Sequence, residues 1–170
     1  MLGWFALAEN AAPGAADRML ESLAADLVGT GLRLAGAVQR NSVPGPDSAC
    51  DMDVVVIGEE DRPIRISQSL GRGSTGCRLD AGALETAAAR VGLRLEGAEL
   101  LILPKFGRQE AIGRGFHAVI AQAVAGGLPV LMHVPAEQRT EFSGFCGGMG
   151  QQIRPEAMRE WCLAQTAGMS

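Results

Sequence analysis

Lysine is nearly absent from this sequence, since Lys105 is the only lysine among fifteen basic residues. The simplest explanation is a GC-rich coding sequence, because such genomes also favour the alanine and glycine that are abundant here. Net charge is −4 and the isoelectric point is about 5.2. A polyanion would not be attracted to such a chain. We therefore expect neither a nucleic-acid partner nor a role at a membrane surface.

Long apolar runs are also missing. No stretch reaches the ~18 residues of a membrane helix, which predicts that the chain does not insert into a membrane. The apolar start has no basic leader and is followed by Glu9, so it predicts a buried strand and not a signal peptide. These features predict a cytoplasmic protein.

None of the four cysteines lies in a C-x-x-C pair, which leaves a zinc ribbon or a thioredoxin site unsupported. Cys50 and Cys77 flank a predicted hairpin and could approach each other as a thiol or metal pair. Two isolated cysteines are more often small buried residues. Both interpretations stay open.

Apolar segments and amphipathic segments alternate along the chain. This order predicts an α/β domain over residues 1–170, with helices on both faces of a mainly parallel sheet and an inserted β-hairpin. We expect strands at 2–9, 32–40, 99–103 and 129–134, and hairpin strands at 54–57 and 64–67. Helices are predicted at 17–28, from Asp80 as N-cap to Leu95, at 112–125 and from Pro155. The glycine-rich segments 71–78 and 144–150 are expected to be irregular, the second as a connector or a lid.

The loop after the first strand has the position and length of a phosphate-binding P-loop, G-x-x-x-x-G-K-[ST]. Pro13 and Gly14 fit such a loop. The lysine position is Asp17, however, and the hydroxyl position is Arg18. A carboxylate at this place repels a γ-phosphate. The loop is either a plain strand–turn–helix connection or a relic that still binds an anion.

A second candidate segment follows the strand at 99–103 and contains the only lysine. Further short motifs occur in order along the chain: Cys50-Asp51-Met52, Ile66-Ser67-Gln68, Gly76-Cys77-Arg78-Leu79-Asp80, Lys105-Phe106-Gly107-Arg108-Gln109-Glu110 and Gly113-Arg114-Gly115. On these motifs the chain resembles a bacterial family of uncharacterised domains, related to the small P-loop nucleoside triphosphatases first known from thermophiles. The resemblance covers nearly the whole chain.

This resemblance implies a three-layer P-loop nucleoside triphosphatase-like fold and, through frequent association with molybdenum-uptake genes, a role near molybdate handling. The chain departs from the family where Pro104 replaces an asparagine. Pro104-Lys105 also occupies the place of the acidic pair that anchors magnesium in active relatives. Glu110 could still act as a base, and Lys105 could replace the missing P-loop lysine. A glutamate at a helix start is also a routine surface residue.

Several cations are expected to converge above the sheet and to bind a small anionic ligand, such as a nucleotide, molybdate or tungstate. The predicted ligand-binding residues are Pro13, Gly14, Asp17, Arg18, Arg40, Ser67, Arg78, Lys105, Arg108 and Arg114. Alternatively, the arginines pair with nearby acids to hold loops in place.

The leading hypothesis is a binding protein of P-loop ancestry that does not hydrolyse its ligand. The rival hypotheses are an active nucleoside triphosphatase or phosphotransferase with an altered site, and a protein-interaction adaptor. The sequence leaves open whether the chain forms a homo-oligomer.

Overall fold

The computed structural model describes residues 1–42, 51–68 and 78–169. Cys50, Cys77 and nearly all of the glycine-rich segment 71–78 lie outside the described residues. The predicted thiol or metal pair is therefore not tested. Among the described helices, none combines the length and the apolar character that crossing a membrane requires.

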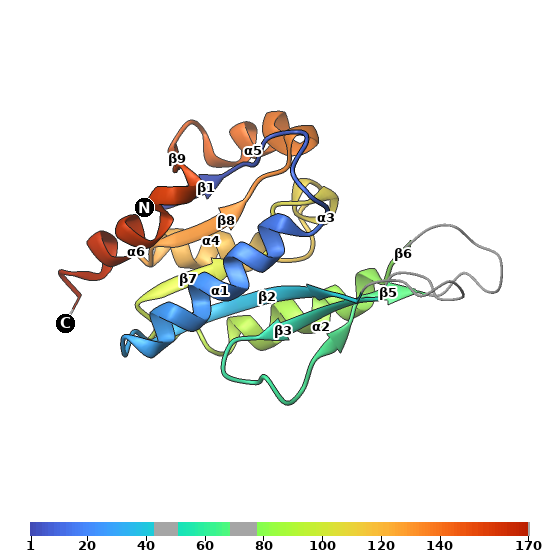
Figure 1. The fold of residues 1–170 in the computed structure, drawn as a ribbon, viewed down its shortest axis with the longest axis horizontal. Coiled ribbons are helices and arrows are strands. Elements are labelled where there is room, and N and C mark those ends of the chain that lie inside the picture. The colour runs from blue at the N-terminus through green and yellow to red at the C-terminus, as the bar shows by residue number, and fades with distance from the viewer. Residues whose placement is uncertain (43–50, 69–77, 170) are drawn as a thin grey trace.

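Six helices and nine strands form the described part of the chain (Figure 1). The helices are α1 (Ala15–Gly29), α2 (Ala81–Gly92), α3 (Arg108–Ala111), α4 (His117–Ala125), α5 (Arg139–Cys146) and α6 (Met158–Thr166), with short 3₁₀ turns η1 (Ala136–Gln138) and η2 (Pro155–Ala157). The strands are β1 (Leu2–Phe5), β2 (Leu34–Asn41), β3 (Met52–Val56), β4 (Ile64–Arg65), β5 (Ser67–Gln68), β6 (Arg78–Leu79), β7 (Leu100–Leu103), β8 (Val130–His133) and β9 (Gly150–Gln152).

Seven of the strands form one sheet in the order β4-β3-β2-β7-β8-β1-β9. β2, β7, β8, β1 and β9 run parallel to one another, whereas β3 and β4 add an antiparallel hairpin next to β2 at one edge. The mainly parallel sheet with an inserted hairpin is thus confirmed, and it is compatible with a P-loop nucleoside triphosphatase-like fold.

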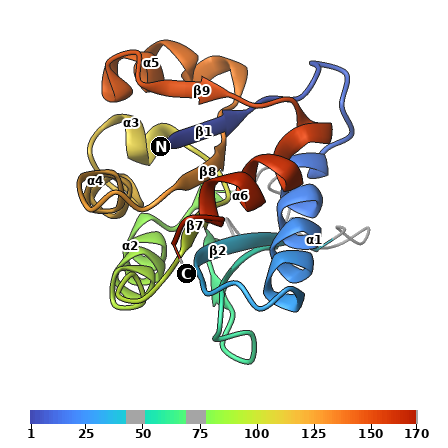
Figure 2. The ribbon, with the colours of Figure 1, turned by 90° about the vertical axis from the view of Figure 1, so that its left-hand side faces the viewer.

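Helices cover both faces of this sheet (Figure 2). One core lies between the sheet and helices α1 and α6, around Leu20, Leu27 and Trp161. The other lies under α2, α4 and α5, around Val91, Ile120 and Phe142. Burial of these apolar faces is the main term that holds the layers together.

Two local features show why the chain follows this path. Asp80 caps α2, because its carboxylate accepts a hydrogen bond from the Ala83 amide at 3.0 Å. Gly36 lies where β2 meets β7, and a Cβ atom there would come within 1.8 Å of the Ile102 carbonyl oxygen. Only glycine allows this close pairing.

Four sequence predictions are wrong in detail. The helix predicted at 112–125 begins only at His117. The irregular connector predicted at 144–150 is confined to residues 147–149, because α5 ends at Cys146 and β9 begins at Gly150. The first strand ends at Phe5. The second hairpin strand pairs with β3 only at Ile64 and Arg65, and Ser67 pairs instead with Leu79 of β6. For the hairpin, the pairing of β5 with β6 replaces further pairing with β3.

Candidate functional site

A cavity of about 630 Å³ opens where β2 and β7 end and the chain leaves β8. In parallel α/β sheets this edge is where ligands bind. We call this space the edge cavity. Its apolar wall consists of Met52, Val54, Ile66, Leu79, Leu84, Pro104, Phe116 and Pro135. Its polar lining consists of Gln39, Lys105, Gly107, Arg108, Gln109, Glu110, Glu137 and Gln138.

Lys105 and Arg108 are the cations of the edge cavity. Both are exposed, and neither forms an ion pair with any residue that the structure describes. The positive charge of Lys105 acts on Asp17 in the first turn of α1 and on His133 at the end of β8. It favours a lower pKa for both groups. Glu110 and Glu137 place two carboxyl groups on the same lining.

His133 closes β8 next to this lining. Burial lowers the pKa of His133 to about 4, and the nearby positive charge of Lys105 acts in the same direction. Its ring packs against Phe5, with 5.3 Å between the ring centroids. The imidazole is therefore neutral at pH 7.

Side-chain hydrogen bonds connect Asp17, in the first turn of α1, to Gln39 of the edge cavity through Asn41. Asn41 donates from Nδ2 to Asp17 at 2.8 Å, and Gln39 donates from Nε2 to Oδ1 of Asn41 at 2.9 Å. Burial raises the pKa of Asp17, while the bond from Asn41 and the charges of Lys105 and Arg18 act the other way. Asp17 thus holds the end of β2 against the first turn of α1.

The loop before α1 is stabilised by contacts among neighbouring residues of the chain. Gly14 is the N-cap of α1 with φ of 75°, a left-handed conformation that favours glycine. The Arg18 guanidinium folds back and donates to the Pro13 carbonyl oxygen at 3.1 Å. Arg18 thus contacts the loop itself and does not reach the edge cavity lining.

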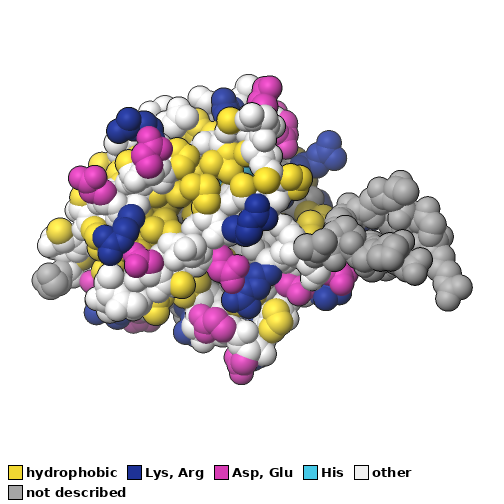
Figure 3. Space-filling view, in the orientation of Figure 1, with side chains coloured by type: hydrophobic (Ala, Val, Ile, Leu, Met, Phe, Trp, Pro, Cys, Tyr) yellow, Lys and Arg dark blue, Asp and Glu magenta, His cyan; other side chains and the backbone are white. Residues whose placement is uncertain are grey.

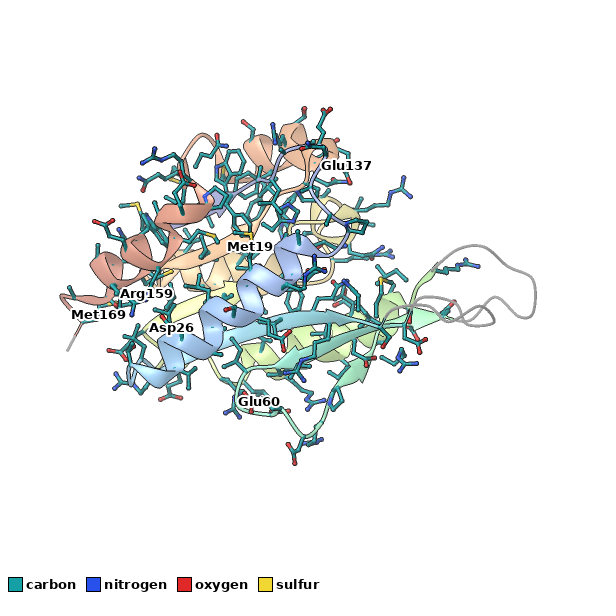
Figure 4. The ribbon with its side chains drawn as sticks, viewed as in Figure 1. Met19, Asp26, Glu60, Glu137, Arg159 and Met169 are labelled. Atoms are coloured by element: carbon teal, nitrogen blue, oxygen red, sulfur yellow. The ribbon has the colours of Figure 1, made fainter. Side chains whose placement is uncertain are left out.

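Arg18 borders a different hollow, of about 650 Å³, between α1 and α6. Hydrophobic side chains gather on this face of the molecule, with charges of both signs around them (Figure 3). Asp26 and Arg159 lie side by side across the two helices and form an ion pair at 2.6 Å (Figure 4). Glu137 lies away from this pair, near α5 (Figure 4).

The structure brings together only part of the predicted ligand-binding set. Arg40 pairs with Glu21 of α1 at 2.5 Å and does not line the edge cavity. The Ser67 hydroxyl accepts a hydrogen bond from the Met52 amide at 2.9 Å, which ties β5 to β3. Arg78 and Arg114 are exposed and are not part of the lining. Lys105 and Arg108 remain at the edge cavity, with Asp17 beside Lys105.

Glu110 is buried, with an exposed fraction of 3%. One carboxylate oxygen accepts from the Gly107 amide at 2.9 Å and the other from the Phe116 amide at 3.0 Å. These bonds fix the segment that carries Lys105 and Arg108. The catalytic role predicted for Glu110 is not tested, and its structural role is now plain.

Sequence reasoning missed Gln39 and Gln109. Gln39 has an exposed fraction of 5% and lines the edge cavity, and it follows directly on the apolar residues of β2. A polar residue at an inward position of a strand was the signal that could have found it. Gln109 also lines the edge cavity, and its side-chain oxygen is buried without a hydrogen-bond partner among the described residues.

Metal-ligating side chains do not cluster in the described part of the chain. No group of three or more histidine, cysteine, aspartate or glutamate side chains there could hold a metal ion. The two described cysteines, Cys146 and Cys162, are buried and free.

A model of the family described as "Protein of unknown function (DUF2478)" matches residues 5–161. The "Molybdenum import ATP-binding protein ModC 2" of Bradyrhizobium diazoefficiens is 39% identical over 139 residues. The match covers 81% of this chain but only 15% of that relative. No solved structure gives a significant match.

Proposed function

We propose that this chain, which belongs to the DUF2478 family, is a P-loop-related domain whose edge cavity binds a small anionic ligand without hydrolysing it. The ligand is a nucleotide or an oxyanion such as molybdate or tungstate. One observation carries the proposal. Lys105 and Arg108 line a cavity at the carboxyl ends of parallel strands, and neither is paired with a described acid.

The absence of hydrolysis follows from the charges around the first loop. Asp17 stands at the P-loop lysine position and holds Asn41, and Arg18 stands at the hydroxyl position. Pro104-Lys105 occupies the place of the magnesium-anchoring acids. A γ-phosphate at the first loop would lack the usual P-loop lysine, and its magnesium ion would lack the usual carboxylate ligand.

Titration calorimetry tests binding. Adenosine monophosphate, molybdate, tungstate and phosphate are titrated into the wild-type chain and into Lys105→Gln, Arg108→Gln and Arg40→Gln. We expect at least one anion to bind and Lys105→Gln or Arg108→Gln to weaken it about tenfold. Arg40→Gln is the matched control, because Arg40 pairs with Glu21 away from the edge cavity. If no anion binds, or if all three variants weaken it equally, the proposal fails.

The Bradyrhizobium relative favours a second candidate function. The matched segment is 15% of a protein named for ATP binding in molybdenum import, so this domain could serve such a protein as an accessory unit. Size exclusion of this chain with the remainder of that relative, expressed without the matched segment, tests this role. Separate elution at micromolar concentration would count against it.

A further inference from the structure

The volume and the apolar wall of the edge cavity also restrict which ligand it can bind. Its volume of about 630 Å³ lies within the range of small-molecule sites, roughly 300–1,000 Å³. A bare tetrahedral oxyanion would leave most of this space empty and the apolar wall unused. The wall formed by Met52, Val54, Leu79 and Phe116 instead suits a ligand with a flat, weakly polar body.

The hydrogen-bond chain at the end of β2 fixes the polarity of the Gln39 amide. Asp17 is a carboxylate and only accepts, so the amide nitrogen of Asn41 must face it. The Asn41 oxygen then accepts from the Gln39 nitrogen. The Gln39 carbonyl oxygen has no hydrogen-bond partner in the described part of the chain, and its amide nitrogen keeps one further N–H. Gln39 therefore offers the edge cavity an acceptor.

Gln109 supplies a second acceptor of the same kind. Its side-chain oxygen is buried and unpaired among residues 1–42, 51–68 and 78–169. Leaving a buried acceptor unpaired is unfavourable, so a rotation that turns this oxygen to a donor in the edge cavity is favourable. Two unpaired amide acceptors above an apolar wall favour a ligand that donates hydrogen bonds.

A charged ammonium group would donate, but it would lose hydration against this apolar wall. The amino group of an aromatic ring is neutral, planar and carries two N–H donors. Such a group donates hydrogen bonds and can also lie against the apolar wall. The cations Lys105 and Arg108 then lie at the exposed rim, where an anionic substituent of the same ligand would be.

We infer that the edge cavity binds an amino-substituted heteroaromatic ring of the purine or pterin class, with Gln39 and Gln109 accepting from its amino group and Lys105 and Arg108 pairing with its anionic substituent. This inference rests on the proposed anion site and names its ligand class.

Calorimetry with matched ligand pairs tests the ring and the anion separately. In two pairs a hydrogen replaces one amino group: adenosine monophosphate and purine riboside monophosphate, and guanosine and inosine monophosphates. In the third pair, pterin carboxylate and the corresponding lumazine carboxylate, an oxo group replaces it. Phosphate and molybdate serve as anions without a ring. In at least one pair we expect the amino member to bind about tenfold more tightly.

Gln39→Leu and Gln109→Leu remove the acceptors at nearly constant volume, and Gln122→Leu, on the exposed side of α4, is the matched control. The preference for the amino member should fall about fivefold in one or both of the first two variants and persist in the control. Circular dichroism and the melting temperature confirm that each variant folds, and either acceptor variant alone suffices for the test.

The outcomes separate the two proposals. Equal binding within every pair, or binding of phosphate and molybdate alone, overturns the inference about the ring and leaves the anion site standing. A preference that survives in both acceptor variants overturns the assignment of Gln39 and Gln109. No binding of any of these compounds overturns the inference and the proposed function together.

Discussion

Gly115 lies so close to Glu110 that a Cβ atom on this glycine would come within 2.2 Å of a Glu110 carboxylate oxygen. The same oxygen accepts from the amide of Phe116, the next residue. The glycine also has a φ of 58°, which side chains rarely adopt. The buried carboxylate and the glycine therefore form one structural unit beneath the edge cavity.

Gly115→Ala should destabilise the fold more than Gly113→Ala does. Both positions have positive φ, so both pay the backbone strain of about 1–2 kcal/mol. A Cβ on Gly113 meets nothing within 4 Å, whereas one on Gly115 collides with Glu110. We expect an additional loss of about 1–3 kcal/mol for Gly115→Ala. Urea denaturation measures the difference, and equal losses would show that the collision relaxes without cost.

Glu110→Gln should also destabilise the fold. The amide has one oxygen acceptor in place of two, so the Gly107 or the Phe116 amide loses its partner in a buried place. We expect a loss of about 1–3 kcal/mol in the free energy of unfolding. Glu141→Gln, on the exposed side of α5, is the control and should change it little. A variant as stable as the wild type would contradict this structural role and leave Glu110 as a candidate base.

Stability should fall in mildly acidic solution because of His133. Its pKa is lowered from 6.5 to about 4 in the fold, so the unfolded chain binds the proton first. The contribution is complete above pH 6.5 and is lost as the pH falls to about 4. The full shift corresponds to about 3.5 kcal/mol at about 1.4 kcal/mol per pKa unit, and partial solvent exposure reduces the expected loss to about 2–3 kcal/mol. Chemical denaturation of the wild type and His133→Phe from pH 4 to 7 measures it, and parallel profiles would contradict this assignment.

Asp17→Asn should strengthen anion binding at the edge cavity. The substitution removes a negative charge next to Lys105 but keeps an oxygen that accepts from Asn41. We expect affinity to rise about threefold to tenfold, and less at high salt. Asp26→Asn removes an equal charge from the Arg159 pair, away from the edge cavity, and is the control. Calorimetry with the best-binding anion decides, and equal gains in both variants would show a general charge effect.

Local signals predicted much of the fold. The Asp80 cap, the proline that opens the turn before α6, and the apolar periods of α1 and α2 act within a few residues, so a sequence displays them directly. The short strand β9 carries no such signal. Its residues Gly150, Gln151 and Gln152 become a strand because β1 offers a free edge to pair with.

The sequence by itself determined that apolar strands alternate with helices, that Lys105 follows a buried strand, and that the acidic Asp17 follows the loop after the first strand. Only the tertiary structure decided which of these residues meet. Strand pairing turns Gln39 into the edge cavity and leaves Arg40 beside Glu21, because successive side chains of a strand face opposite sides of a sheet. Folding of the chain around α3 likewise turns Glu110 inward, where the amides of Gly107 and Phe116 donate to its carboxylate. The sequence alone does not show whether a glutamate at a helix start faces solvent or the interior.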